Sequence, residues 1–198
     1  MLVLTIVVAY LIGSISSSTL LSRWFAKIDI REHGSGNAGA TNTLRVLGLR
    51  FALVVLFADI LKGMLAIAIA WWVGHGNPWY TFIDGTAVIV GHNWPVFFGF
   101  RGGKGVATTI GVYAITMFVP AVTAGVIAIV LVAVSRFVSL GALTFTILTP
   151  IFILVLEPHR TGALVFAIVI AVVSVVRHRR NITRLLKGQE HRIFTKRF

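Results

Sequence analysis

Residues 112–126 read VYAITMFVPAVTAGV and form the middle of an apolar stretch of 30 residues, 106–135. Such a stretch is either one long kinked membrane span or two short helices that meet at Pro120, because proline removes a helical hydrogen bond and clashes with the preceding turn. The choice between one and two helices sets the number of spans. It therefore also sets the side of the membrane on which the chain ends.

The composition of the chain places it in the membrane. Of its 198 residues, 57% are hydrophobic and only 12% are charged, whereas a soluble domain has about 25% charged residues. This difference excludes a soluble enzyme, a coiled coil and a disordered protein. The other apolar stretches are 2–22, 51–73, 81–100, 138–156 and 161–176. Since a span needs about 20 residues, we expect one all-α, polytopic integral membrane bundle over 1–198, with no separate soluble domain.

The positive charges favour two helices in 106–135. That choice gives about seven transmembrane helices, with the N-terminus outside and the C-terminus cytoplasmic. It puts 16 of the 18 lysines and arginines on the cytoplasmic side. A single helix would separate the eight basic residues of the tail from those of 23–50, against the positive-inside rule. The chain has no cysteine, so disulfides and thiolate metal sites are also excluded.

A first polar motif, HGSGNAGATN at 33–42, lies in a predicted cytoplasmic loop and is followed by Arg45. Glycines, hydroxyls and amides beside an arginine are suited to form a backbone cradle for an anion. Its candidate substrate-binding or catalytic residues are Ser35, Asn37, Thr41, Asn42 and Arg45. The motif also matches the dinucleotide fingerprint G-x-G-x-x-G, but that fingerprint needs a strand–turn–helix unit, and 51–73 is a membrane span. The remaining alternative is a plain glycine-rich loop.

A second motif, GHNWPVFFGFRGGKG at 91–105, ends in a loop that leads into the next helix. Gly102, Gly103 and Gly105 let the backbone approach a ligand closely, and Lys104 supplies positive charge. The unpaired N–H groups and the positive dipole end of the following helix favour an anion at the same place. We expect a phosphate site here. In the alternative, Arg101 and Lys104 only anchor the topology.

A third motif, RHRRNITRLLKGQEH at 177–191, leaves the last span. His178, Asn181 and Arg184 are spaced i, i+3 and i+6 and are predicted to share one helical face. Glu190 is the only acidic residue among eight basic ones in the tail. A basic surface attracted to anionic lipid is the alternative for the arginines.

Ionisable residues also lie within the predicted spans. Asp59 and Lys62 are spaced i, i+3, so an ion pair is their structural interpretation. His92 either is a satisfied bundle residue or lines a polar pocket. Ionisable groups at membrane depth are costly and usually face a polar cavity.

The three motifs together, GSGNAGATN (34–42), GGKG (102–105) and HRRN with GQE (178–190), resemble those of the bacterial acyl-phosphate-dependent glycerol-3-phosphate acyltransferases, the PlsY family. The likeness extends over the whole chain. It implies transfer of an acyl group from acyl phosphate to the 1-hydroxyl of sn-glycerol 3-phosphate, giving lysophosphatidic acid and phosphate at the cytoplasmic side of the bacterial inner membrane. In the family this reaction begins phospholipid synthesis.

The resemblance also implies roles for individual residues. Ser35, His178 and Asn181 are expected to be catalytic and Glu190 and Asp59 structural. The expected substrate-binding residues are Arg45, Lys104, Gly102, Gly103, Gly105, Asn37, Thr41, Asn42, His92 and Lys62. We expect no cofactor, no metal and no nucleic acid partner, only the two substrates and the bilayer.

The histidines give separate support for an acyl-transfer chemistry that differs from that of many other glycerolipid acyltransferases. Many other glycerolipid acyltransferases carry an H-x-x-x-x-D dyad, but none of the six histidines here has aspartate five residues later. Two rivals remain, a transporter of an anionic solute and a non-catalytic basic membrane protein. A transporter usually contains repeated halves, and none is visible.

Overall fold

The computed structural model describes residues 1–193, and all of their regular elements are helices. The chain forms two compact units, Met1–Thr116 and Met117–Phe198. The prediction of an all-α integral membrane bundle is confirmed. The two units are defined by how the helices pack and do not show how many functional domains there are. The expectation of one domain over 1–198 therefore stays a prediction.

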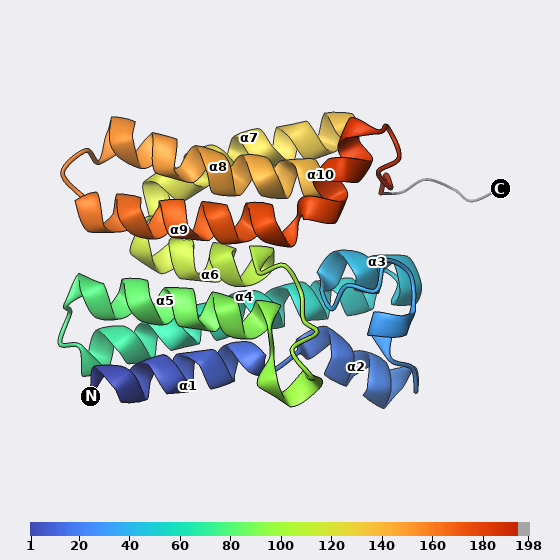
Figure 1. The fold of residues 1–198 in the computed structure, drawn as a ribbon, viewed down its shortest axis with the longest axis horizontal. Coiled ribbons are helices and arrows are strands. Elements are labelled where there is room, and N and C mark those ends of the chain that lie inside the picture. The colour runs from blue at the N-terminus through green and yellow to red at the C-terminus, as the bar shows by residue number, and fades with distance from the viewer. Residues whose placement is uncertain (194–198) are drawn as a thin grey trace. The chain divides into compact units, whose positions relative to one another are not determined.

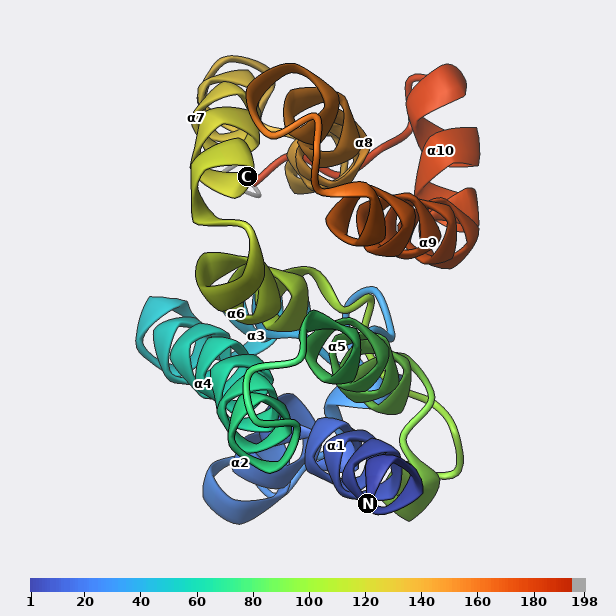
Figure 2. The ribbon, with the colours of Figure 1, turned by 90° about the vertical axis from the view of Figure 1, so that its left-hand side faces the viewer.

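The first unit contains six α-helices and two short 3₁₀ helices (Figure 1). Their bounds are α1 Leu2–Ser14, α2 Ser17–Phe25, η1 Ile30–Glu32, α3 Ala40–Leu47, α4 Leu49–Val73, α5 Pro78–Asn93, η2 Val96–Phe98 and α6 Val106–Thr116. Helix α1 packs against α5, and α4 packs against α6 (Figure 2). The two motif loops precede α3 and α6.

Glycines bring the backbones of these helices into contact. A Cβ on Gly91 of α5 would overlap the carbonyl oxygen of Tyr10 on α1, and a Cβ on Gly111 of α6 would overlap that of Ile60 on α4. Small residues permit such close approach, which matters in a membrane because lipid offers little hydrophobic driving force between helices.

The second unit contains α7 Phe118–Ser135, α8 Val138–Leu156, α9 Thr161–Arg177 and α10 Arg179–Leu186. Helix α8 packs against both α7 and α9. The chain bends by 64° between α9 and α10. After α10, the N–H of Ile193 donates to the carbonyl of Arg136 at 2.9 Å, which ties the described tail to the corner between α7 and α8.

The stretch 106–135 is two helices, as the charge argument required, but the predicted position of the break is wrong. The chain breaks at Met117, and Pro120 lies in the first turn of α7, where its missing N–H costs no hydrogen bond. Among the described residues, four segments are long and apolar enough to cross a membrane, or five if α9 and α10 form one bent span. The count of seven spans and the orientation of the termini stay predictions.

Of two other predicted stretches, one is interrupted within a single candidate span, Leu2–Phe25, and the other ends early. The stretch 2–22 is interrupted, because the backbone is extended at Ile15 and Ser16. The stretch 81–100 is helical only to Asn93, since the residue before Pro95 is disfavoured in helical conformation. The first break lies in 14–19, where five of the six residues carry a hydroxyl group, and the second lies directly before Pro95.

We expect Gly111→Ala to destabilise the first unit by about 1–3 kcal/mol, because the new methyl group would meet a backbone carbonyl rather than a flexible side chain. Gly125→Ala on α7 is the matched control, since a Cβ there would lie 3.9 Å from the nearest atom, a ring carbon of Phe145. Thermal unfolding of the purified proteins in detergent measures the difference. Equal midpoints for the two variants would contradict the proposed close approach of α4 and α6.

Candidate active site

The loop between η1 and α3 is organised around the side chain of Asn42, which is 1% exposed. Its Oδ1 accepts a hydrogen bond from the backbone N–H of Ser35 at 2.8 Å, and its Nδ2 donates to the carbonyls of Ile30 and His33 at 3.0 and 2.9 Å. Gly34 lies at φ +61°, and a Cβ there would overlap Oδ1 of Asn42. These contacts give Asn42 a structural role, and its expected part in substrate binding stays a prediction.

The other candidate residues of the first motif lie nearer the surface. Ser35 is exposed, and Asn37 and Thr41 are half-buried. Arg45 is exposed in the last turn of α3. Because Asn42 fixes the backbone at Ser35, the serine side chain projects from a defined position on the loop.

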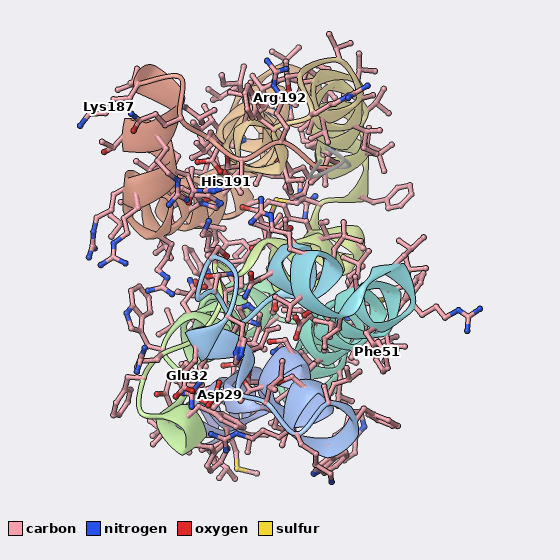
Figure 3. The ribbon with its side chains drawn as sticks, turned by 90° about the vertical axis from the view of Figure 1, so that its right-hand side faces the viewer. Asp29, Glu32, Phe51, Lys187, His191 and Arg192 are labelled. Atoms are coloured by element: carbon pink, nitrogen blue, oxygen red, sulfur yellow. The ribbon has the colours of Figure 1, made fainter. Side chains whose placement is uncertain are left out.

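A charge cluster anchors the chain just before this loop. Asp29 accepts hydrogen bonds from Arg31 at 2.7 Å and from Arg23 at 2.8 Å, and Figure 3 shows Asp29 close to Glu32 on this segment. The hydrogen bond from Arg31 holds the pKa of Asp29 well below its usual range. Arg31 also donates to the carbonyl of Phe98 at 2.6 Å. The arginine thus links η1 to η2, and with it the first motif to the second.

The second motif packs directly on the end of α5. The N–H of Gly103 donates to the carbonyl of His92 at 3.1 Å. A Cβ on Gly103 would overlap Nε2 of His92 and lie 2.6 Å from the carbonyl oxygen of Ala38 in the first motif. The structure therefore brings the first and second motifs together. Gly103 is required by this packing, in addition to any role in binding an anion.

The loop then leads into α6 in a way that suits an anion. Gly105 lies at φ +77° immediately before the helix, and Lys104 beside it is half-buried. The first N–H groups of a helix have no acceptor within it and form the positive end of its dipole. Asn93 lies close by and is fully buried, and neither polar atom of its side chain has a hydrogen-bond partner among the described residues.

Asp59, Lys62 and His92 form a buried cluster beside this loop. The ammonium of Lys62 lies 2.9 Å from Oδ1 of Asp59 and donates to the carbonyls of Gly13 and Ile15 at 3.1 and 2.8 Å. An ammonium has three hydrogens, so these three acceptors match its donors. The contacts suit a structural role for Lys62, and its expected contact with substrate stays a prediction. Nδ1 of His92 lies 3.6 Å from the same carboxylate oxygen.

In the second unit, His178 is the residue between α9 and α10 and is 2% exposed. Its Nδ1 lies 2.8 Å from the carbonyl oxygen of Ser174. A carbonyl only accepts hydrogen bonds, so this contact assigns the hydrogen of a neutral ring to Nδ1 and leaves Nε2 as the basic nitrogen. The hydroxyl of Thr146 on α8 donates to the Ser174 hydroxyl at 3.1 Å, which supports the same turn of α9.

Glu190 holds the third motif together. One carboxylate oxygen accepts from Nδ2 of Asn181 at 2.8 Å, and the other accepts from Nε of Arg184 at 2.9 Å. Burial opposes ionisation, but the hydrogen bonds from Arg184 and Asn181 outweigh it and keep the pKa of Glu190 below its usual value. The sequence suggested a structural role for Glu190, and these contacts suit it.

The spacing argument for the third motif is partly wrong. Asn181 and Arg184 lie on α10 and contact the same carboxylate, but His178 lies at the bend before that helix. Sequence reasoning also missed the Ser174 carbonyl as the acceptor for His178, although Ser174 stands four residues earlier, at helical spacing. Residues 1–193 contain no cluster of three histidine or acidic side chains suited to a metal.

The long apolar helices and the two contacting glycine-rich loops define an all-helical integral membrane protein with a polar, anion-suited site. Comparison with known proteins identifies the family more narrowly. The family model "Glycerol-3-phosphate acyltransferase" matches residues 3–188. The chain therefore belongs to the glycerol-3-phosphate acyltransferase family, and the resemblance drawn from the three motifs is confirmed.

Individual relatives agree over nearly the full length. The chain is 48% identical over 194 residues to the glycerol-3-phosphate acyltransferase of Halalkalibacterium halodurans, with 96% of this chain and 94% of the relative covered. It is 46% identical over 196 residues to that of Shouchella clausii, with 97% and 96% covered.

Solved structures are also similar. The crystal structure of PlsY (YgiH), an integral membrane glycerol 3-phosphate acyltransferase, in its glycerol 3-phosphate form matches with a TM-score of 0.91 and 39% identity, covering 97% of this chain and 95% of that chain. The lysophosphatidic acid form matches with a TM-score of 0.87 and 38% identity, covering 96% and 94%.

We expect Glu190→Gln to lower stability by about 1.5–3 kcal/mol at pH 7, the range for hydrogen bonds made by a charged group. Because the folded pKa of Glu190 lies below the unfolded value of about 4.3, this stabilisation is present above that pH and is lost on acidification through the folded pKa. Thermal midpoints of wild type and variant should therefore differ at pH 7 and converge below pH about 4. Glu32→Gln, at an exposed carboxylate, is the control and should show little difference at either pH.

Proposed function

We propose that this protein transfers an acyl group from acyl phosphate to the 1-hydroxyl of sn-glycerol 3-phosphate. The observation that carries the proposal is the contact between the two glycine-rich loops at Gly103 and Ala38. Each loop is associated with a basic residue, Arg45 or Lys104, and both substrates carry a phosphate group. Charge-assisted hydrogen bonds and a helix N-terminus are suited to bind two such groups.

The proposed reaction is direct attack. The 1-hydroxyl oxygen forms a bond to the acyl carbonyl carbon, the bond from that carbon to the phosphate oxygen breaks, and phosphate leaves with the electron pair. The hydroxyl proton passes to Nε2 of His178 or to a substrate phosphate, while Asn181 helps to position the hydroxyl. Ser35 and the loop N–H groups orient the donor and stabilise the developing oxyanion. Acyl phosphate is already an activated anhydride, so an acyl-serine intermediate is not needed.

The donor is tested with purified protein in detergent. We expect release of phosphate from acyl phosphate only when glycerol 3-phosphate is also present, and no lysophosphatidic acid when acyl-CoA or acyl carrier protein replaces acyl phosphate. Radiolabelled acyl phosphate given alone should leave no label on the quenched protein. Equal activity with acyl-CoA would refute the donor assignment, and a labelled protein that passes its acyl group to glycerol 3-phosphate would refute direct attack.

We propose further that the three motifs lie on the cytoplasmic side of a bacterial inner membrane. The basic residues of 23–50, 101–105 and 177–193 support this, because positively charged loops remain inside. Arg160 lies between α8 and α9 and is the one basic residue assigned to the outside.

The side is tested by cysteine labelling, since the chain contains no cysteine. Glu32→Cys and Gln189→Cys should resist an impermeant maleimide applied to intact cells, and His159→Cys in the α8–α9 connection should be labelled. All three positions are exposed, so permeabilised cells should show labelling at each. Labelling of Gln189→Cys in intact cells would place the tail outside and remove the seven-span topology.

A further inference from the structure

We propose that Asp59 and His92 are positioning residues for the phosphate-binding loop 102–105, acting through the contact between the His92 ring and Gly103. The proposal rests on the proposed function in one respect, that this loop binds a substrate phosphate. It assigns His92 to the support of the loop, in place of a direct contact with substrate.

The contacts run from the membrane-embedded helices to the loop. Oδ1 of Asp59 on α4 lies 3.6 Å from Nδ1 of His92 on α5. On its opposite edge the ring is in contact with the loop, since a Cβ on Gly103 would overlap Nε2 and lie 2.9 Å from Cδ2. The His92 carbonyl also accepts the hydrogen bond from the Gly103 N–H. The ring and the backbone of one residue thus both meet the same glycine.

The need to neutralise the charge of Asp59 does not explain why a histidine is buried at position 92. Lys62 already pairs with Asp59 at 2.9 Å, and the hydroxyl of Ser17 donates to the same oxygen at 3.0 Å. An ionisable group buried in a membrane bundle is costly, and such groups usually mark a functional site. The imidazole is therefore an additional polar group, with the Asp59 carboxylate 3.6 Å from Nδ1 on one side and Gly103 in contact on the other.

The position of Gly103 bears directly on ligand binding. Lys104 follows it, and α6 begins two residues after Lys104. A shift of the Gly103 backbone would move both the lysine and the first N–H groups of the helix away from a bound phosphate. Loss of the His92 support should therefore weaken binding of one substrate more than it slows the chemical step.

The test measures KM and kcat for acyl phosphate and for glycerol 3-phosphate separately. Lys104→Ala first identifies the substrate whose phosphate the loop binds, by a rise in KM for that substrate. We then expect His92→Gln and Asp59→Asn to raise KM for the same substrate about 10-fold, with KM for the other substrate within about 2-fold of wild type. His92→Gln leaves the Asp59–Lys62 pair intact, so it tests the proposal even if Asp59→Asn does not fold.

A further variant separates positioning from a general effect on folding. Asp84→Asn is the matched control, because Asp84 is a buried aspartate like Asp59. It lies on α5, the helix of His92, but eight residues, or about 12 Å of helix, away from it. Its KM values should equal those of wild type.

The outcomes distinguish the two proposals. If Lys104→Ala leaves both KM values unchanged, the phosphate-binding role of the loop is wrong. If Lys104→Ala raises KM but folded His92→Gln does not, the loop role stands and the positioning role is overturned. A KM change in Asp84→Asn equal to that in His92→Gln would also overturn it.

Discussion

The ammonium group of Lys62 is the contact on which the arrangement of the first unit depends. The break between α1 and α2 leaves the carbonyls of Gly13 and Ile15 without helical partners, and Lys62 donates to both. Within a membrane no water is available to satisfy such groups, so a broken helix is tolerated only where protein supplies the hydrogen bonds. Asp59 on the preceding turn of α4 balances the charge. The pair and the break therefore depend on each other, and together they join α1, α2 and α4.

Glycine serves two purposes in this unit. At Gly91 and Gly111 the absence of a side chain lets helices touch through their backbones. At Gly103 it lets the second motif approach both His92 and the first motif. A sequence motif rich in glycine thus combines the demands of packing with those of ligand binding. Loss of activity in a glycine variant does not by itself distinguish them, and substitution of the neighbouring His92 separates the two effects better.

The second unit orients its histidine without a carboxylate. In a serine–histidine–aspartate triad an acidic side chain fixes the tautomer of the imidazole. Here a main-chain carbonyl, that of Ser174, occupies the equivalent position at Nδ1. The acidic residue of the motif, Glu190, binds Asn181 and Arg184. A neutral acceptor gives less stabilisation to an imidazolium than a carboxylate would. This arrangement is in keeping with the proposed direct attack, in which the leaving group is already good and only a modest base is required.

The sequence alone determined the membrane class, the helical nature of the chain, the two helices in 106–135 and the family, because hydropathy, charge and short motifs are local properties. It did not determine where α1 ends or why the loop after η1 keeps its shape. Lys62 finds its acceptor 49 residues away at Gly13, and Arg31 finds its acceptor 67 residues away at Phe98. The sequence named Asn42, Lys62 and His92 as polar residues near the motifs. Only the tertiary structure decided which groups they contact, because the partner of a buried donor is set by the packing of distant segments.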